Sequence, residues 1–216
     1  MIKFIIFDMD GTLVDTIKGI EKGLNSALKI LGYKSHYSYD EVKSFIGNGA
    51  RVLFLKATKK DLIDEKEYQI YLNEYRDHQK YSEIYEGCID FLIKAKRAGI
   101  KLFIHSNKPD ILLQILVDDL NLREYFLEIK GENGGFRRKP DIEFIKYLEN
   151  KYQLNLDEGV YVGDSIVDLE TAKNAKIKSI IFKDGYGNKE EIMKGNPDYF
   201  IDDFYQLKEI VFNDKK

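Results

Sequence analysis

The chain has 216 residues, and 44% of them are hydrophobic and 33% charged. Against a typical domain of about 150 residues, this length favours one large domain or one domain with a smaller insertion, and the composition excludes a disordered chain. The 34 basic and 37 acidic residues leave a formal net charge of −3, which indicates neither nucleic acid nor an anionic membrane as a partner.

The first apolar run is too short to be a targeting or membrane segment. Asp8 ends it, well before the roughly 7–15 apolar residues of a signal peptide. No other stretch approaches the roughly 18 apolar residues of a membrane helix. Cys88 is the only cysteine, which excludes an intramolecular disulfide, so we expect a cytoplasmic protein.

Two carboxylates follow this run, which predicts a buried strand over residues 2–6. Asp8 and Asp10 are two residues apart, so on extended backbone they project to the same side, and Gly11 permits the turn that follows. Open α/β sheets place their sites at the carboxyl ends of such strands. Because two close like charges need a cation or a shared proton, the pair predicts a magnesium-type site, an acid/base pair, or both.

Residues 15–85 form a block in which we expect helices and no strand. Apolar positions spaced by three and four predict a first helix that Gly32 ends. Ser38 and Glu41 have the spacing of a capping box, and an apolar stripe over residues 68–75 predicts a further helix. An all-helical block within a chain that begins with a strand is typical of an inserted domain.

After residue 86 short apolar runs alternate with helical patterns. This alternation predicts a parallel sheet covered on both faces, so the fold class is α/β, with a Rossmann-like core over residues 1–14 and 86–216 and a helical cap over residues 15–85. The expected strands are 100–104, ending at Ser106, then 126–129, 160–162, 179–182 and 199–201, and the expected helices are 87–98, 111–116, 141–152, 167–175 and 204–212.

Polar residues at the ends of these strands should converge at one edge of the sheet. Ser106 and Asn107 follow the second strand, and Asp164 and Asp168 follow a later one. Together with Asp8 and Asp10, such carboxylates make the oxygen-rich site that magnesium prefers. Asp164 is the best third ligand, and Asp168, one helical turn further on, is expected to orient the ligands or to hold a metal-bound water.

An anionic substrate at this acidic site needs a positive charge besides the metal. Lys139 precedes Pro140, and proline suits the first position of a helix, so we expect Lys139 beside a helix N-terminus that favours anions. Arg137 and Arg138 compete for this role, and a basic run is otherwise a solvated surface. Lys108 is interpreted as covering a helix start, and His105 as a packed strand residue.

Four segments together resemble the four motifs of the haloacid dehalogenase superfamily. They are DMDGT at residues 8–12, Ser106, Lys139 with Pro140, and GDSIVD at residues 163–168. Their order and spacing cover nearly the whole chain. The resemblance implies that the helical insertion is the family's smaller cap, the type that directly follows the first strand.

The resemblance also implies a role for each residue. Asp8 would attack phosphorus and form an aspartyl-phosphate, while Asp10 would protonate the leaving oxygen and then activate water. Magnesium would bind Asp8, Asp164 and the backbone carbonyl of Asp10. The phosphoryl oxygens would be held by Ser106, Asn107 and Lys139.

Narrower similarities point to the phosphoglycolate phosphatase branch. Asp10 itself favours phosphoryl transfer, because the founding dehalogenases usually lack a second aspartate. The similar segments are IGNGA at residues 46–50, SNKP at 106–109, DGYGN at 184–188 and NPDYFIDDFYQL at 196–207. They imply a magnesium-dependent phosphatase acting on a small phosphorylated metabolite, with phosphoglycolate as the first candidate.

The glycine loop at residues 46–50 has two interpretations. Gly47 and Gly49 would let cap amides approach the far end of the substrate, with Arg51 as a carboxylate partner, or the loop is only a turn between helices. It lacks the lysine and hydroxyl residue of a nucleotide P-loop.

Other functions remain as alternatives. A phosphomutase of the β-phosphoglucomutase kind would share every catalytic residue, pyrophosphate hydrolysis is a third option, and a non-catalytic binding module is a different class altogether. The sequence is compatible with either a monomer or a homodimer.

Overall fold

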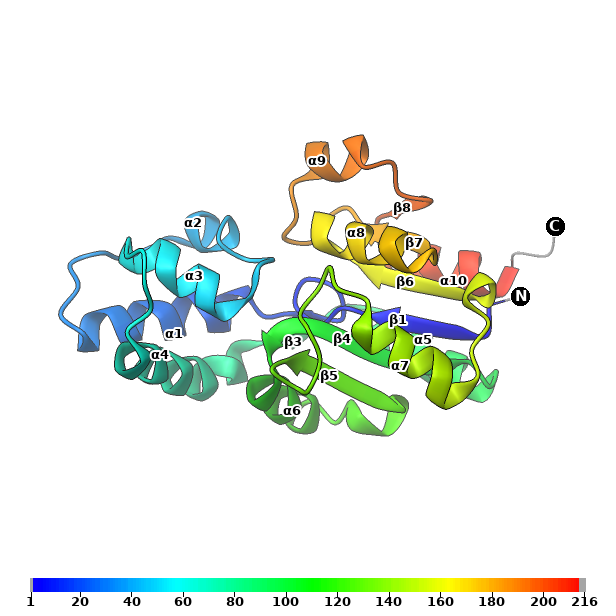
Figure 1. Cartoon of the computed structure of the whole chain (residues 1–216), viewed down its shortest axis with the longest axis horizontal. Coiled ribbons are helices and arrows are strands. Elements are labelled where there is room, and N and C mark those ends of the chain that lie inside the picture. Colours follow the sequence, from blue (N-terminus) through cyan, green and yellow to red (C-terminus); the bar gives the residue numbers. More distant parts are fainter. Residues whose placement is uncertain (1, 214–216) are drawn as a thin grey trace.

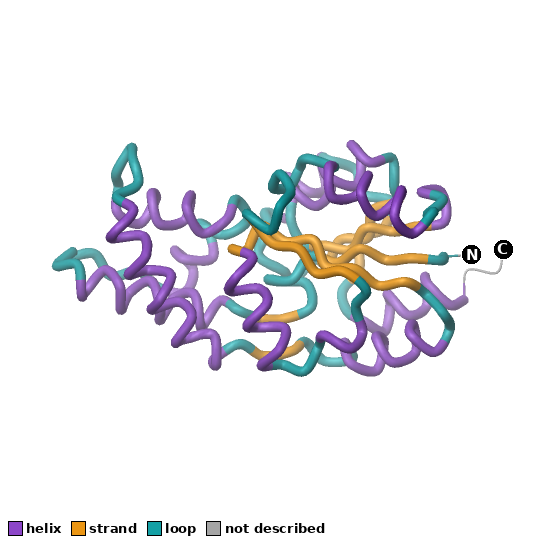
Figure 2. The backbone as a smooth tube through the Cα atoms, turned by 60° about the horizontal axis from the view of Figure 1, so that its bottom comes forward, coloured by secondary structure: helices purple, strands orange, loops and turns teal. Residues whose placement is uncertain are grey.

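The computed structural model of the protein describes residues 2–213. Six parallel strands form one sheet in the order β5-β4-β1-β6-β7-β8 (Figures 1 and 2). The predicted α/β fold with a Rossmann-like parallel sheet is confirmed. The strands are β1 (Phe4–Phe7), β4 (Lys101–Pro109), β5 (Glu128–Glu132), β6 (Gly159–Gly163), β7 (Lys178–Phe182) and β8 (Tyr199–Ile201).

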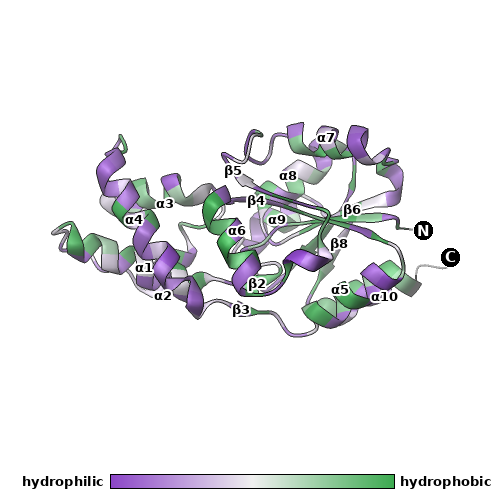
Figure 3. Cartoon of the chain, turned by 90° about the horizontal axis from the view of Figure 1, so that it is seen from below, coloured by the Kyte–Doolittle hydropathy of each residue, from purple (hydrophilic) through white to green (hydrophobic). Residues whose placement is uncertain are grey.

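Helices cover both faces of this sheet because its central strand is apolar on both sides. Ile5 and Phe7 of β1 belong to a core cluster with α5, α6 and α10, whereas Phe4 and Ile6 pack with α7 and α8. On the first face α5 and α10 lie side by side, with hydrophobic residues where they meet (Figure 3). The helices are α5 (Cys88–Arg97), α6 (Asp110–Asp119), α7 (Glu143–Tyr152), α8 (Ile166–Ala175), α9 (Lys189–Lys194) and α10 (Phe204–Asn213).

The cap lies at the carboxyl end of β1, on the left of Figure 1. It contains four α-helices and the short 3-10 helix Gln79–Tyr81. Its apolar residues form a cluster of their own, and the Ser38–Glu41 capping box is present. Gly23 allows α1 and α4 to approach closely, because a Cβ atom there would lie 2.7 Å from the Cα atom of Tyr75. The helices are α1 (Ile17–Ile30), α2 (Tyr39–Lys43), α3 (Gly49–Thr58) and α4 (Glu65–His78).

The structure corrects the expectation that residues 15–85 contain no strand. β2 (Val14–Asp15) and β3 (Glu83–Ile84) pair antiparallel where the chain leaves and re-enters the core. Strands of two residues are too short to show an alternating pattern. The short helix α9 was also missed, since its sequence KEEIMK has a single buried residue, Ile192.

Several element boundaries differ from the prediction, and two of these differences affect the site. Strand β4 continues through Ser106 to Pro109, and α7 begins at Glu143 instead of at Pro140 or Asp141. A turn precedes α7, in which the Asp141 N–H donates to the carbonyl of Arg138 and the Asp141 carboxylate accepts from the Glu143 N–H. This turn delays the start of the helix, so Lys139 is not adjacent to a helix N-terminus.

None of the helices within residues 2–213 combines the length and the apolar character that a membrane crossing requires. The longest of them, α1 and α4, have 14 residues each.

The lone cysteine, Cys88, should be chemically inert in the folded protein. It is the first residue of α5, it is fully buried, and burial raises the pKa of its thiol to about 12. Since the thiolate is the reactive form, we expect no reaction with Ellman's reagent at pH 8 and one equivalent after unfolding in guanidinium. Rapid labelling of the native protein would contradict this packing.

Candidate active site

The carboxyl edge of the sheet brings together residues from four parts of the chain. Asp8 follows β1, Ser106 lies in β4, Lys139 comes from the loop before α7, and Asp164 follows β6. All four are at most 8% exposed. The convergence expected for the ends of parallel strands therefore occurs.

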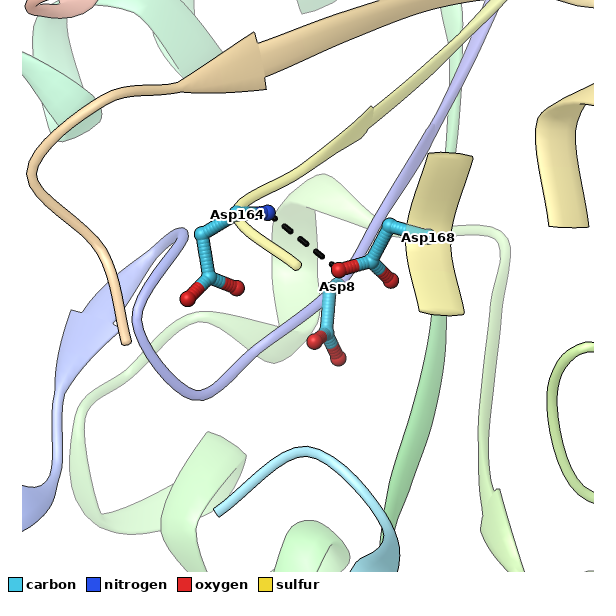
Figure 4. Close-up of side chains that lie close together, drawn as sticks. All are labelled: Asp8, Asp164 and Asp168. Atoms are coloured by element: carbon cyan, nitrogen blue, oxygen red, sulfur yellow. Dashed lines mark hydrogen bonds between the residues drawn. The ribbon is translucent and has the colours of Figure 1, made fainter. Parts of the chain in front are cut away.

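Three carboxylates form the centre of this site. Asp8, Asp164 and Asp168 each place an oxygen within 4.8 Å of the other two, and all are buried (Figure 4). Together with Asp10, these carboxylates outnumber the two nearby ammonium groups, those of Lys139 and Lys108, two to one.

The charge balance of the cluster fits a divalent cation. Burial raises the pKa of Asp8 to about 6, against the pull of Lys139, and burial together with Asp168 and Asp8 raises the pKa of Asp164 well above its usual range. Because burial raises both pKa values, further positive charge is needed to keep these carboxylates ionised. Clustered carboxylate oxygens are ligands that magnesium prefers, so these residues fit that metal.

Hydrogen bonds fix the carboxylates of Asp8 and Asp164. The Met9 N–H donates to Asp8 Oδ1 at 2.7 Å. Asp164 Oδ1 accepts from the Thr12 hydroxyl at 3.1 Å, and its Oδ2 accepts from the Tyr186 N–H at 2.6 Å. Tyr186 belongs to the segment DGYGN at residues 184–188, so this segment supplies a backbone amide that orients Asp164.

Asp168 uses both of its oxygens within the protein. Its Oδ2 accepts from the Asp164 N–H at 3.2 Å, the dashed line in Figure 4, and from the N–H and hydroxyl of Ser165. Its Oδ1 accepts from Lys139 Nζ at 2.7 Å. These partners favour an orienting role for Asp168 over direct metal binding, which is one of the two roles expected from the sequence.

Lys139 bridges two carboxylates from a fully buried position. Its Nζ lies 2.9 Å from Asp8 Oδ1 and 2.7 Å from Asp168 Oδ1. Burial disfavours the ammonium, but Asp168 and Asp8 outweigh it and raise the pKa of Lys139 well above its usual range. The competing arginines lie elsewhere: Arg137 is 78% exposed beside Asp141, and Arg138 donates to the carbonyl of Asn48.

Asn107 holds the loop that carries Lys139. Its Oδ1 accepts from the Lys139 N–H at 2.8 Å, and its Nδ2 donates to the carbonyls of Lys139 and of Gly47 in the cap, each at 3.3 Å. The side chain that was expected to bind phosphate is therefore engaged in joining the core to the cap loop.

Lys108 is the site residue that the sequence interpretation missed. Instead of covering a helix start, it is buried, with its Nζ 3.1 Å from Asp10 Oδ1, in contact with the Tyr75 hydroxyl and 4.2 Å from the centre of that ring. β4 runs on to Pro109 but is irregular after His105, and its last four residues, Ser106 to Pro109, all line the cavity. A pattern of alternating sides could not have placed Lys108, because the end of the strand is irregular.

A small cavity of about 60 Å³ lies between these residues and the cap. Gly47 and Gly49 line it, but Arg51 does not. The guanidinium of Arg51 instead pairs with Glu65 at 2.7 Å on the surface. Since α3 begins at Gly49, successive residues are turned by about 100° around the helix, and Ala50 faces the cavity while Arg51 points away.

A family model for haloacid dehalogenase-like hydrolases matches residues 5–182. The chain belongs to this family. Curated relatives of this haloacid dehalogenase-like hydrolase include the phosphoglycolate phosphatases of Vibrio cholerae, 30% identical over 97% of both chains, and of Agrobacterium fabrum, 34% identical over 96% of this chain and 91% of the relative. It falls in the phosphoglycolate phosphatase-like branch, a group of phosphoric monoester hydrolases.

Solved structures agree with this placement of the haloacid dehalogenase-like hydrolase. A predicted phosphoglycolate phosphatase from Haemophilus somnus is 28% identical and superimposes with a TM-score of 0.86 over 97% of both chains. CbbY from Rhodobacter sphaeroides, solved in complex with phosphate, has a TM-score of 0.82 over 96% of both chains. At 21% identity, CbbY supports the fold alone.

Proposed function

We propose that this hydrolase is a magnesium-dependent phosphatase that cleaves a small phosphomonoester, phosphoglycolate first among them, through an aspartyl-phosphate at Asp8. One observation carries the proposal: Asp8 lies in a buried cluster with Asp164 and Lys139, while Asp10 lines the same cavity. A nucleophile, a proton carrier and a cation for the phosphoryl group thus meet at one place.

The metal would be held by Asp8, Asp164 and the backbone carbonyl of Asp10. When bound, it would neutralise charge so that a carboxylate can approach an anionic phosphate. Thr12 and the Tyr186 amide keep Asp164 in position for this task.

In the first step an oxygen of Asp8 forms a bond to phosphorus while the bond from phosphorus to the ester oxygen breaks. Asp10 gives its proton to that oxygen, and Lys139 and Ser106 hold the phosphoryl oxygens. In the second step Asp10, now a carboxylate, takes a proton from water. The water oxygen attacks phosphorus, and Asp8 leaves as a carboxylate together with inorganic phosphate.

The cap residues around the cavity favour a small substrate. Ile20, Ile46 and Leu53 of the cap form an apolar wall on one side of the cavity that Asp8 and Asp10 line. A phosphomutase must also hold a sugar and a second phosphate, but the cap arginine beside the glycine loop, Arg51, is paired with Glu65 outside the cavity. The apolar cap wall and the engaged arginine favour hydrolysis of a small phosphomonoester over the mutase alternative.

A substrate panel tests this function. We expect inorganic phosphate release with magnesium, highest kcat/KM for phosphoglycolate, and lower values for glucose 1-phosphate, pyrophosphate and nucleoside monophosphates. EDTA should stop the reaction and excess magnesium should restore it. Activity that survives EDTA would refute the metal site, and a preference for pyrophosphate or hexose phosphates would refute the substrate class. A chain that releases phosphate from none of these would support the binding-module alternative.

Substitution of Gly185 should weaken the metal site. A Cβ atom at this position would lie 2.2 Å from the Cβ atom of Asp164. Gly185→Ala is therefore expected to displace that carboxylate and to raise the magnesium concentration for half-maximal activity by about 10- to 100-fold.

The control for this variant is Gly99→Ala, at the opposite edge of the sheet. Gly99 has a φ of +74° and no neighbour for a Cβ atom, so the change should lower stability and leave the magnesium requirement intact. An unchanged magnesium requirement in Gly185→Ala would show that this close contact does not control Asp164.

A further inference from the structure

The cavity contains one cation besides the acidic cluster. Among the described residues that line it, Lys108 carries the only positive charge, and the cap side is largely apolar, with Ile20, Ile46 and Leu53. Lys108 is 3% exposed and reaches the cavity from β4. A charge buried this deeply needs anionic or hydrogen-bonding partners, and in the structure these are the Asp10 carboxylate and the Tyr75 hydroxyl.

A second polar group in the cavity has no partner in the structure. The hydroxyl of Tyr71, on helix α4 of the cap, is buried and makes no hydrogen bond. Stacking fixes the ring, since it lies parallel to Phe54 at 5.2 Å and to Tyr75 at 5.9 Å between centroids. A rigid donor that lines a cavity without an acceptor is placed to bind an acceptor atom of a ligand.

Lys108 also lies beside the carboxylate of Asp10, the proposed proton donor to the leaving group. Its Nζ is 3.1 Å from Oδ1 of Asp10, the residue that protonates the ester oxygen in the proposed mechanism. In phosphoglycolate the carboxylate is attached to the carbon that bears this ester oxygen. A substrate that accepts a proton from Asp10 therefore carries its carboxylate into the neighbourhood of Lys108.

We propose that Lys108 and Tyr71 form the subsite for the carboxylate of the leaving group. This subsite selects phosphomonoesters that bear a carboxylate on the carbon next to the ester oxygen, over neutral esters of the same length. The inference rests on the proposed function and replaces Arg51 as the carboxylate partner, because Arg51 pairs with Glu65 outside the cavity.

A purely positioning role for Lys108 makes a different prediction. If it only orients Asp10, its loss slows every substrate to the same degree. If it binds the carboxylate, the loss falls mainly on KM and on carboxylated substrates. The comparison therefore uses phosphoglycolate and ethyl phosphate, which differ in the carboxylate and share the phosphoester.

The test measures kcat and KM of the magnesium-loaded enzyme for both substrates. Tyr71→Phe removes one hydroxyl and keeps the stacked ring, so kcat/KM for phosphoglycolate should fall about 10-fold, mainly through KM, with ethyl phosphate within twofold of wild type. In Lys108→Met the ratio of kcat/KM for phosphoglycolate to that for ethyl phosphate should fall about 100-fold. Tyr68→Phe is the matched control, because Tyr68 is a buried tyrosine of α4 that does not line this cavity, and it should change neither substrate.

Equal losses on both substrates in Tyr71→Phe and Lys108→Met would overturn the subsite. So would a wild-type enzyme that prefers ethyl phosphate, although magnesium-dependent hydrolysis of that ester would leave the proposed phosphatase intact. If Lys108→Met fails to fold, the kinetics of Tyr71→Phe alone decide whether the carboxylate subsite exists. Absence of turnover with either ester would instead refute the proposed function.

Discussion

Asp8→Asn should reduce phosphate release by at least about 10³-fold, to the background rate. The substitution preserves the size of the side chain but removes the carboxylate oxygen that attacks phosphorus. It also weakens the cluster with Asp164. The measurement is kcat for p-nitrophenyl phosphate at saturating magnesium, a substrate whose good leaving group minimises dependence on Asp10.

A measurement of thermal stability is the control for Asp8→Asn. Burial raises the pKa of Asp8 to about 6, above the usual 3.8, so its protonated form stabilises the fold at low pH and this contribution is lost as the pH rises through 6. At pH 7.5 without magnesium a neutral Asn at position 8 should therefore melt at the same temperature as wild type or higher. Retained turnover in a folded Asp8→Asn variant would refute Asp8 as the nucleophile.

Lys139→Met should damage both catalysis and folding. Its Nζ contacts Asp8 and Asp168, and the side chain is 2% exposed. Removing one partner of a buried ion pair leaves uncompensated charge, so the free energy of unfolding should fall by about 3–5 kcal/mol in urea titrations without magnesium. We expect kcat/KM to fall by about 10³-fold, because the phosphoryl oxygens lose their ammonium.

Arg137→Met is the matched control for this variant. Arg137 belongs to the same basic run, but its side chain is 78% exposed and its pair with Asp141 lies on the surface. The free energy of unfolding should stay within about 0.5 kcal/mol of wild type, with unchanged kinetics. Equal effects of the two substitutions would show that Lys139 has no special role.

The sheet and the acidic cluster could be predicted because both depend on strong local patterns. Each long apolar run became a strand, and parallel strands place their polar ends together, so Asp8 and Asp164 meet although they are far apart in sequence. The paired strands β2 and β3 could not be predicted, because two residues carry no periodic pattern and their pairing is a tertiary contact.

Side-chain direction was the harder part of the site. Lys108 and Arg51 are both cations close to a motif, yet Lys108 is buried against Asp10 and Arg51 pairs with Glu65 on the surface. The difference follows from where β4 ends and where α3 begins, and element boundaries are the least certain part of a sequence prediction. Asn107 likewise belongs to a motif, but its side chain accepts a hydrogen bond from the backbone N–H of Lys139.

The most direct test of the proposed chemistry is a phosphoenzyme burst in Asp10→Asn. With p-nitrophenyl phosphate the first step needs little proton donation, whereas the second step lacks its base and becomes slow. We predict a burst approaching one p-nitrophenol per active site, with the phosphoryl group on Asp8 in peptides from the acid-quenched protein. Continuous p-nitrophenol release without a burst, or a phosphoryl group on any other residue, would contradict the account.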